Sequence, residues 1–142
     1  MLKEVELRHY MVPNPVTIAP DANLFEAMHL ILVHKISGLC VVDELNRLVG
    51  ILSELDCLRG VLDSVYNDAG IGLVSDAMTT ENLKTARAHD SIADVASDML
   101  EDSKRRRPVL DVDGRLVGQV TIRQLLRVVK EFNHPPDPTE AD

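Results

Sequence analysis

Apolar residues recur at helical spacing in two stretches that lie far apart in the chain. Apolar positions repeating every three or four residues predict an amphipathic helix with one buried face. Each stretch begins with a short polar residue and an acid three residues later, Asn23 with Glu26 and Ser91 with Asp94. This is the pattern of a capping box, or a near variant, at a helix N-terminus. The apolar positions are Leu24, Ala27, Met28, Ile31 and Leu32 in the first stretch, and Ile92, Val95, Ala96, Met99 and Leu100 in the second.

Short apolar runs flank each predicted helix and are typical of β-strands. One run precedes each helix, two runs joined by a turn follow it, and a second helix closes the series. Asp113-Gly114 is a good hairpin signal and Leu45-Asn46 is a weaker one. The predicted strands cover residues 16–18, 39–43, 48–52, 84–86, 108–111 and 116–120, and the closing helices cover residues 54–65 and 122–132.

The two series are copies of one unit. A shift of 68 residues overlays residues 16–61 on residues 84–129 without a gap, and Arg47-Leu48-Val49-Gly50 then meets Arg115-Leu116-Val117-Gly118. Identities spread through the whole unit indicate an internal repeat. One β-α-β-β-α unit cannot cover both faces of its sheet, so we expect an α/β (α+β) fold in which the two copies bury a shared core.

The repeat divides the chain into four parts. The first copy covers residues 1–66 and the second covers residues 75–134, with a linker at 67–74 that is polar and contains glycine. Residues 135–142 offer nothing that could enter a core, so we expect a disordered tail that is dispensable for folding.

Composition excludes several classes of function. The 142 residues carry a net charge of −8 and only 3% aromatic residues, which disfavours binding to nucleic acid. No apolar run approaches the ~18 residues needed to cross a membrane, and the N-terminus does not resemble a signal peptide, so a cytoplasmic location is expected. We expect Cys40 and Cys57 to be buried free thiols. The sequence contains no recognisable catalytic set or metal-ligand spacing, so we expect neither an enzyme nor a metal site.

The ordered motifs resemble the CBS motif, the repeat named after cystathionine β-synthase. Each copy has an apolar-apolar-Asp strand and Arg-Leu-Val-Gly, followed by Ser53-Glu54-Leu55-Asp56 in one copy and Thr121-Ile122-Arg123-Gln124 in the other. The resemblance covers residues 8–133 and implies two CBS motifs related by pseudo-twofold symmetry, with two clefts between them. In the family these clefts often bind adenosine-containing ligands such as AMP, ATP or S-adenosylmethionine. CBS pairs usually dimerise, and they regulate partner proteins without doing chemistry themselves.

Ser53-x-x-Asp56 stands where a strand becomes a helix and has two interpretations. A carboxylate can accept two hydrogen bonds from a ribose diol, and a helix N-terminus suits a phosphate. The same pattern is also an ordinary helix cap. Lys104-Arg105-Arg106-Arg107 is likewise either a phosphate clamp or a solvated helix end.

The gamma subunit of AMP-activated kinase, which this pair resembles, suggests how the cluster and the acid combine. Its residues before the equivalent strand face the phosphate of a nucleotide whose ribose is held by the other motif. Carried over, Arg105 and Arg106 would face a ligand held by Asp56, and Arg123 matches another basic position. Leu83 and Lys84 would contact the base. The resemblance therefore implies a ligand site comprising Ile51, Ser53, Asp56, Leu83, Lys84, Arg105, Arg106 and Arg123.

The second cleft departs from the family pattern because Gln124 stands where the ribose acid is expected. An amide keeps one acceptor but loses the charge and the paired carboxylate geometry. This doubtful cleft would comprise Val16, Thr17, Ser37, Thr121 and Gln124. We therefore expect one competent site, with an adenine nucleotide as regulatory ligand and an unknown effector protein as partner. The alternative is a dimerisation scaffold that binds no nucleotide.

A homodimer is expected because the closing helices have more apolar residues than one core needs. These residues are Leu58, Val61, Leu62 and Val65 in the first copy, and Leu125, Leu126, Val128 and Val129 in the second.

Overall fold

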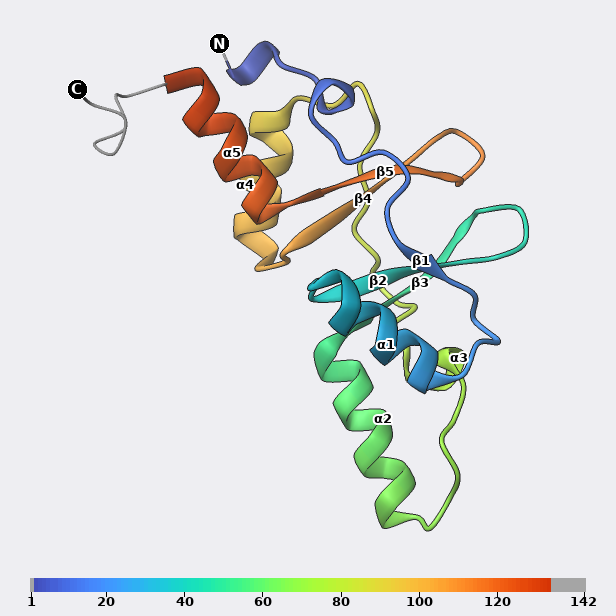
Figure 1. Ribbon diagram of the computed structural model, residues 1–142. Coiled ribbons are helices and arrows are strands. Elements are labelled where there is room, and N and C mark those ends of the chain that lie inside the picture. Colours follow the sequence, from blue (N-terminus) through green and yellow to red (C-terminus); the bar gives the residue numbers. More distant parts are fainter. Residues whose placement is uncertain (1, 134–142) are drawn as a thin grey trace, which may run out of the picture.

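The computed structural model describes residues 2–133, and the predicted disordered tail at 135–142 lies outside the described residues (Figure 1). The mixed α/β fold class is confirmed, and the predicted β-α-β-β-α order is present in full in the first copy. Two short 3-10 helices, η1 (Leu2–Glu4) and η2 (Leu7–His9), precede the first copy. The first copy comprises β1 (Thr17–Ile18), α1 (Leu24–His34), β2 (Gly38–Val42), β3 (Leu48–Ser53) and α2 (Glu54–Tyr66). The second comprises α3 (Val74–Ala77), α4 (Ile92–Asp102), β4 (Arg106–Leu110), β5 (Leu116–Thr121) and α5 (Ile122–Asn133).

The two sheets differ in size. The first has the order β1-β2-β3, with β1 parallel to β2 and β2 antiparallel to β3. The second contains only β4 and β5, paired antiparallel. The predicted strand at residues 84–86 is therefore wrong, because only Ala86 is bridged, to Val109. Ala86 is buried, while Lys84 and Thr85 are exposed. Only one residue of the predicted strand therefore packs against the sheet.

Both predicted hairpin turns are confirmed, and each contains a residue with positive φ. Asn46 has φ of 63° and Gly114 has φ of 81°. The side chain of Asp43 accepts hydrogen bonds from the backbone N–H groups of Leu45 and Arg47, both at 2.9 Å. The aspartate that ends each apolar strand therefore stabilises the turn that follows it.

The predicted side-chain cap of α1 forms, whereas that of α4 does not. The side chain of Asn23 accepts a hydrogen bond from the backbone N–H of Phe25 at 2.7 Å. Ser91 makes no such bond, and its hydroxyl is oriented to donate to the carbonyl of Lys3 at 2.9 Å. A contact with the distant N-terminal segment thus replaces the local cap that the sequence predicts.

Buried residues form two clusters, where a single shared core was expected. Leu7, from the start of the chain, is fully buried in the cluster of the second copy. Val74, from the start of the second copy, is fully buried in the cluster of the first. We call residues 2–12 and 71–79 the exchanged segments, because each packs against the copy that does not follow it. In Figure 1 the N-terminal segment runs beside α4 and α5, and α3 lies beside α1 and α2.

Two glycines at equivalent positions let the exchanged segments approach the sheets. An added Cβ at Gly50 would lie 2.6 Å from Sδ of Met78, and one at Gly118 would lie 2.8 Å from Sδ of Met11. Isolated backbone bridges join Ile51 to Thr79 and Gln119 to Val12 beside these contacts. The glycines therefore permit close backbone approach, as glycine within a strand often does.

The two copies also meet through equivalent residues. The N–H of Leu48 donates to the carbonyl of Gly114 at 3.1 Å, and the N–H of Leu116 donates to that of Asn46 at 2.9 Å. A shift of 68 residues exchanges these two hydrogen bonds, so the pseudo-twofold axis passes between them. Figure 1 shows the two hairpin tips side by side at one edge of the molecule, with the long helices at the other.

Several apolar residues on the helices lie outside both cores. Leu32 and its equivalent Leu100, predicted to face a core, are 72% and 76% exposed. Leu125 and Val128, predicted to lie on a partner surface, are instead buried in the second core. The other expected surface residues of the closing helices are exposed or half-buried: Leu58, Val61, Leu62, Val65, Leu126 and Val129.

Both cysteines are buried and free, as predicted. Burial raises the pKa of Cys40 to about 11, with the positive charge of Arg106 opposing the shift. No helix between residues 2 and 133 is long and apolar enough to cross a membrane.

We predict that Gly118→Ala lowers the free energy of unfolding by about 1–3 kcal/mol, because the new methyl group overpacks the contact with the exchanged segment. The added Cβ would lie 2.9 Å from the carbonyl oxygen of Val12, which is held by its own pairing with Gln119. Urea denaturation measures the change. Gly70→Ala is the control, because no atom lies within 4 Å of an added Cβ there. Equal effects of the two substitutions would contradict the close contact.

Candidate functional site

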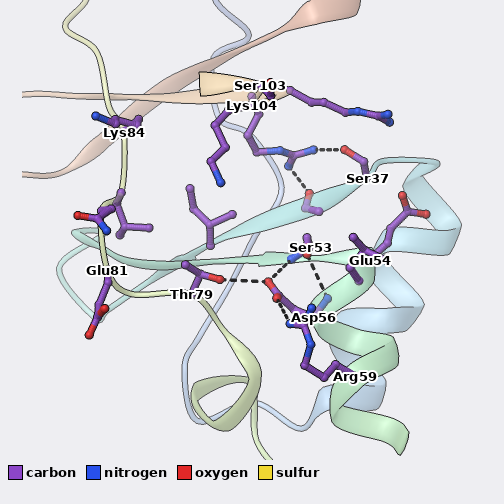
Figure 2. Close-up of a pocket in the computed structure, with 17 residues that line it drawn as sticks. Ser37, Ser53, Glu54, Asp56, Arg59, Thr79, Glu81, Lys84, Ser103 and Lys104 are labelled. Atoms are coloured by element: carbon purple, nitrogen blue, oxygen red, sulfur yellow. Dashed lines mark hydrogen bonds and ion pairs between the residues drawn. The ribbon is translucent and has the colours of Figure 1, made fainter. Parts of the chain in front are cut away.

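A pocket of about 510 Å³ lies between the two copies (Figure 2). One wall comes from the start of β2, the end of β3 and the first turns of α2. The facing wall comes from the end of the second exchanged segment and from the residues that lead into β4. The lining residues are Ser37, Gly38, Ile51, Ser53, Glu54, Leu55, Asp56, Arg59, Thr79, Glu81, Asn82, Leu83, Lys84, Ser103, Lys104, Arg105 and Arg106.

This pocket brings together most of the predicted ligand site. Ile51, Ser53, Asp56, Leu83, Lys84, Arg105 and Arg106 all line it. Arg123 is not among the lining residues. It lies in the first turn of α5, whereas the helix that lines this pocket is α2, where Leu55 holds the equivalent position. Ser37, assigned from sequence to the second cleft, lines this pocket instead.

Asp56 is buried beside the pocket and already has hydrogen-bond partners. Its Oδ2 accepts from the backbone N–H of Ser53 at 3.0 Å, and Ser53 Oγ accepts in return from the N–H of Asp56 at 3.1 Å. This reciprocal pair is a capping box that begins α2. The helix-cap interpretation of Ser53-x-x-Asp56 is therefore correct, and a ligand role would be additional to it.

Two residues that sequence reasoning missed complete the surroundings of Asp56. The hydroxyl of Thr79 donates to Oδ2 at 3.5 Å, and Arg59 donates to Oδ1 at 3.1 Å (Figure 2). Arg59 could have been found from its spacing, because residues three apart on a helix are neighbours. Thr79 could not, because the pairing of its segment with Ile51 leaves no local signal in the sequence.

Arg106 joins the two copies through hydrogen bonds, a contact that we call the tie between the copies. One guanidinium nitrogen donates to Ser37 Oγ at 2.8 Å and the other to the carbonyl oxygen of Gly38. Gly38 is the position equivalent to Arg106 in the first copy, so this contact also lies near the pseudo-twofold axis. Burial lowers the pKa of Arg106, and the nearby Glu54 opposes that shift.

The other cations of the basic cluster have different roles. Arg107 is buried and pairs with Asp102 at 2.7 Å, so it belongs to the protein interior. Lys104 and Arg105 are exposed at the pocket and form no ion pair within residues 2–133, and the same is true of Lys84. The cluster is therefore neither a uniform phosphate clamp nor a uniform solvated helix end.

The residues predicted for the second cleft are not gathered in the same way. Thr121 accepts a hydrogen bond from the backbone N–H of Gln124 at 3.2 Å, which begins α5. The side-chain amide of Gln124 donates to the carbonyl of Tyr10 in the first exchanged segment, and its Oε1 is buried without a partner in the described structure. Thr17 pairs with Cys40 inside the first sheet, and Val16 packs against the first core.

The family model of the CBS domain matches residues 6–63 and 74–131 of this chain. Among curated proteins, the chain is 34% identical over 127 residues to an inosine-5'-monophosphate dehydrogenase from Halalkalibacterium halodurans. It is 29% identical over 131 residues to the uncharacterized protein MJ1225 of Methanocaldococcus jannaschii. The matches cover 89% and 90% of this chain, but only 25% of the dehydrogenase and 45% of MJ1225. The chain thus spans about a quarter of the dehydrogenase and under half of MJ1225.

Solved structures with the same fold include ligand complexes. The crystal structure of CBSX2 in complex with AMP superposes with a TM-score of 0.80 at 28% identity, covering 90% of this chain and 98% of that one. The CBS domain pair of MJ0100, solved with 5'-methylthioadenosine and S-adenosyl-L-methionine, gives 0.77 at 25% identity and covers 90% of this chain and 98% of that one.

We predict that Arg106→Ala lowers the free energy of unfolding by about 1–3 kcal/mol, because Ser37 and Gly38 lose their hydrogen-bond donor. Arg105→Ala is the matched control and is expected to change the value by less than about 0.5 kcal/mol, because Arg105 is exposed and unpaired. Chemical denaturation of the three proteins makes the comparison. If Arg106→Ala were as mild as Arg105→Ala, the tie between the copies would contribute nothing to stability.

Proposed function

Because this chain belongs to the CBS domain family, we propose that it is a regulatory module that binds an adenosine-containing nucleotide and thereby modulates a partner protein. The observation that supports this most is the composition of the pocket between the copies. The N-terminus of α2, with Ser53 and Asp56, faces the exposed cations Lys104 and Arg105 of the other copy. The pocket volume of about 510 Å³ falls within the range usual for small-molecule sites.

The pocket offers a suitable surface for each part of a nucleotide. Ile51 and Leu83 provide apolar surface for a base. Asp56 lines the pocket, and its carboxylate oxygens can accept further hydrogen bonds from a ribose diol. The cations at the start of β4 attract a phosphate.

The solved neighbours support the chemical class of the ligand. CBSX2 was crystallised with AMP, and the MJ0100 pair with two other adenosine-containing molecules. All three share the adenosine moiety and differ in what is attached to its ribose. We therefore propose the class and leave the ligand itself to direct measurement with AMP, ADP, ATP and S-adenosylmethionine.

Regulation, and not catalysis, is the proposed role. The dehydrogenase relatives contain this chain's match within about a quarter of their length, so their activity is not carried over. A cytoplasmic location and an effector protein that reads the bound state belong to the same proposal.

A scaffold without nucleotide is the second candidate, and one observation favours it. The capping box of Ser53 and Asp56 is complete without a ligand, and Arg59 occupies the second carboxylate oxygen. A thermal-shift series separates the two candidates, because a ligand in hundredfold excess over its Kd stabilises the folded state by ~2.7 kcal/mol. No shift with any adenosine compound would favour the scaffold.

Self-association is the remaining part of the proposal. Leu58 of α2 and Leu126 of α5 occupy equivalent positions and are 58% and 65% exposed. In Figure 1 α5 lies at the upper left and α2 at the bottom, both away from the hairpin tips. Exposed apolar residues on a helix surface are typical of a protein–protein interface.

We predict that Asp56→Ala abolishes the preference for AMP over 2',3'-dideoxy-AMP. In the wild-type protein the two ribose hydroxyls should improve affinity roughly ten- to a hundredfold, as expected for hydrogen bonds to a charged acceptor. In the variant the two affinities should become nearly equal. Titration calorimetry measures both ligands on both proteins, and the ratio cancels any general effect on the fold.

Asp76→Ala is the matched control for this experiment. Asp76 Oδ2 accepts from the backbone N–H of Leu73 at 3.0 Å, a cap of the same kind outside the pocket. Its removal should leave the preference for AMP unchanged. An undiminished preference in Asp56→Ala would show that Asp56 is a helix cap alone.

We predict a homodimer at micromolar concentration that Leu58→Glu with Leu126→Glu converts to a monomer, because two buried charges oppose association. Leu45→Glu is the control, since Leu45 is exposed on a hairpin turn away from the helices. Light scattering during gel filtration gives the mass of each protein. A monomeric wild type, or a dimeric double variant, would contradict the proposed surface.

A further inference from the structure

We propose that Lys104 is the residue by which the pocket recognises a single phosphate group, whereas Arg106 holds the two copies together and takes no direct part in that recognition. This assignment rests on the proposed function, because it concerns the charged end of the same ligand. It replaces the expectation from sequence that Arg106 faces the phosphate.

Arg106 is already held in place by hydrogen bonds to the other copy. Its guanidinium bonds to Ser37 and Gly38 across the boundary between the copies. These bonds use two of its five N–H donors, and a phosphate that drew the guanidinium out of this position would leave Ser37 Oγ and the Gly38 carbonyl oxygen without their partner. Leaving such groups unpaired is costly in a partly buried position.

Lys104 has a fixed backbone and a free side chain. Ser103 ends α4 in the left-handed conformation, with φ of 57°, and so turns the chain toward the pocket. The backbone N–H of Lys104 then donates to Asp102 Oδ1 at 3.0 Å and to the carbonyl of Met99 at 3.2 Å. In Figure 2 the side chain extends from the start of β4 toward the part of the pocket formed by Ser53 and Thr79, whereas Lys84 points away.

The repeat shows that Lys104 is particular to this pocket. The equivalent residue of the first copy is Ile36, which packs against the first core. Any cleft on the other side of the pseudo-twofold axis therefore has no cation at this position.

The carboxylates of the rim limit how much negative charge the pocket accepts. Glu54 and Glu81 line it and form no ion pair within the described part of the chain. Three exposed cations, Lys84, Lys104 and Arg105, are thus opposed by two acids, and this small excess of positive charge suits one phosphate better than three. We infer that a nucleoside monophosphate binds more tightly than the corresponding triphosphate.

The test is a calorimetric titration of adenosine, AMP and ATP into the full chain and its variants. Wild-type protein should bind AMP about tenfold more tightly than adenosine, the usual magnitude for a charge-assisted contact at a partly open site. ATP should bind no more tightly than AMP. We call the ratio of the affinity for AMP to the affinity for adenosine the advantage of AMP. This ratio should fall as salt screens the charges, while the affinity for adenosine stays constant.

Three variants and a control identify the residue that recognises the phosphate. Lys104→Met should reduce the advantage of AMP to about twofold or less and leave adenosine binding unchanged. Arg106→Ala should weaken adenosine and AMP by the same factor, so that the advantage persists. Arg105→Ala should reduce the advantage less than Lys104→Met does, and Lys130→Met, on the far end of α5, should change nothing.

The proposal is overturned if Lys104→Met keeps the advantage of AMP, if Arg106→Ala or Arg105→Ala removes it, or if ATP binds more tightly than AMP. If neither adenosine nor AMP binds the wild-type protein, the proposed function itself fails.

Discussion

The exchange of two short segments between the copies is the constraint on which the rest of the structure depends. Leu7 completes the core of the second copy and Val74 completes that of the first, so neither copy is closed without a segment from elsewhere. Gly50 and Gly118 set how closely these segments approach the sheets. The pairing of Thr79 with Ile51 then carries the chain across the N-terminus of α2, and the residues that follow form the facing wall of the pocket. The pocket is therefore a consequence of the exchange that closes the cores.

A nearly symmetric backbone supports two different environments. Asp56 is replaced at the equivalent position by Gln124, whose amide is bound to Tyr10. Lys104 corresponds to Ile36, and Arg106 corresponds to Gly38. Each substitution places charge on one side of the pair and removes it from the other. Duplication thus supplied the scaffold, and divergence at a few equivalent positions made the two sides chemically different.

Local patterns in the sequence predicted the elements well, because each helix and hairpin has its own periodicity, cap or turn residue. The two hairpin turns and the gathering of Ser53, Asp56 and Arg105 at one pocket agree with the sequence. Two of the errors have the same physical source, which is contact between distant segments. Ser91 donates a hydrogen bond to Lys3 and does not cap its helix, and Arg106 donates hydrogen bonds to Ser37 and Gly38.

The central claim is that the pair has one competent nucleotide site per chain, formed between Asp56 of the first copy and the cations that precede β4 of the second. The most direct measurement is the stoichiometry of AMP binding to the full-length chain by calorimetry, at a protein concentration well above the dissociation constant. One AMP per chain is the predicted result. Two equivalent molecules per chain, or no binding of AMP, would contradict the claim.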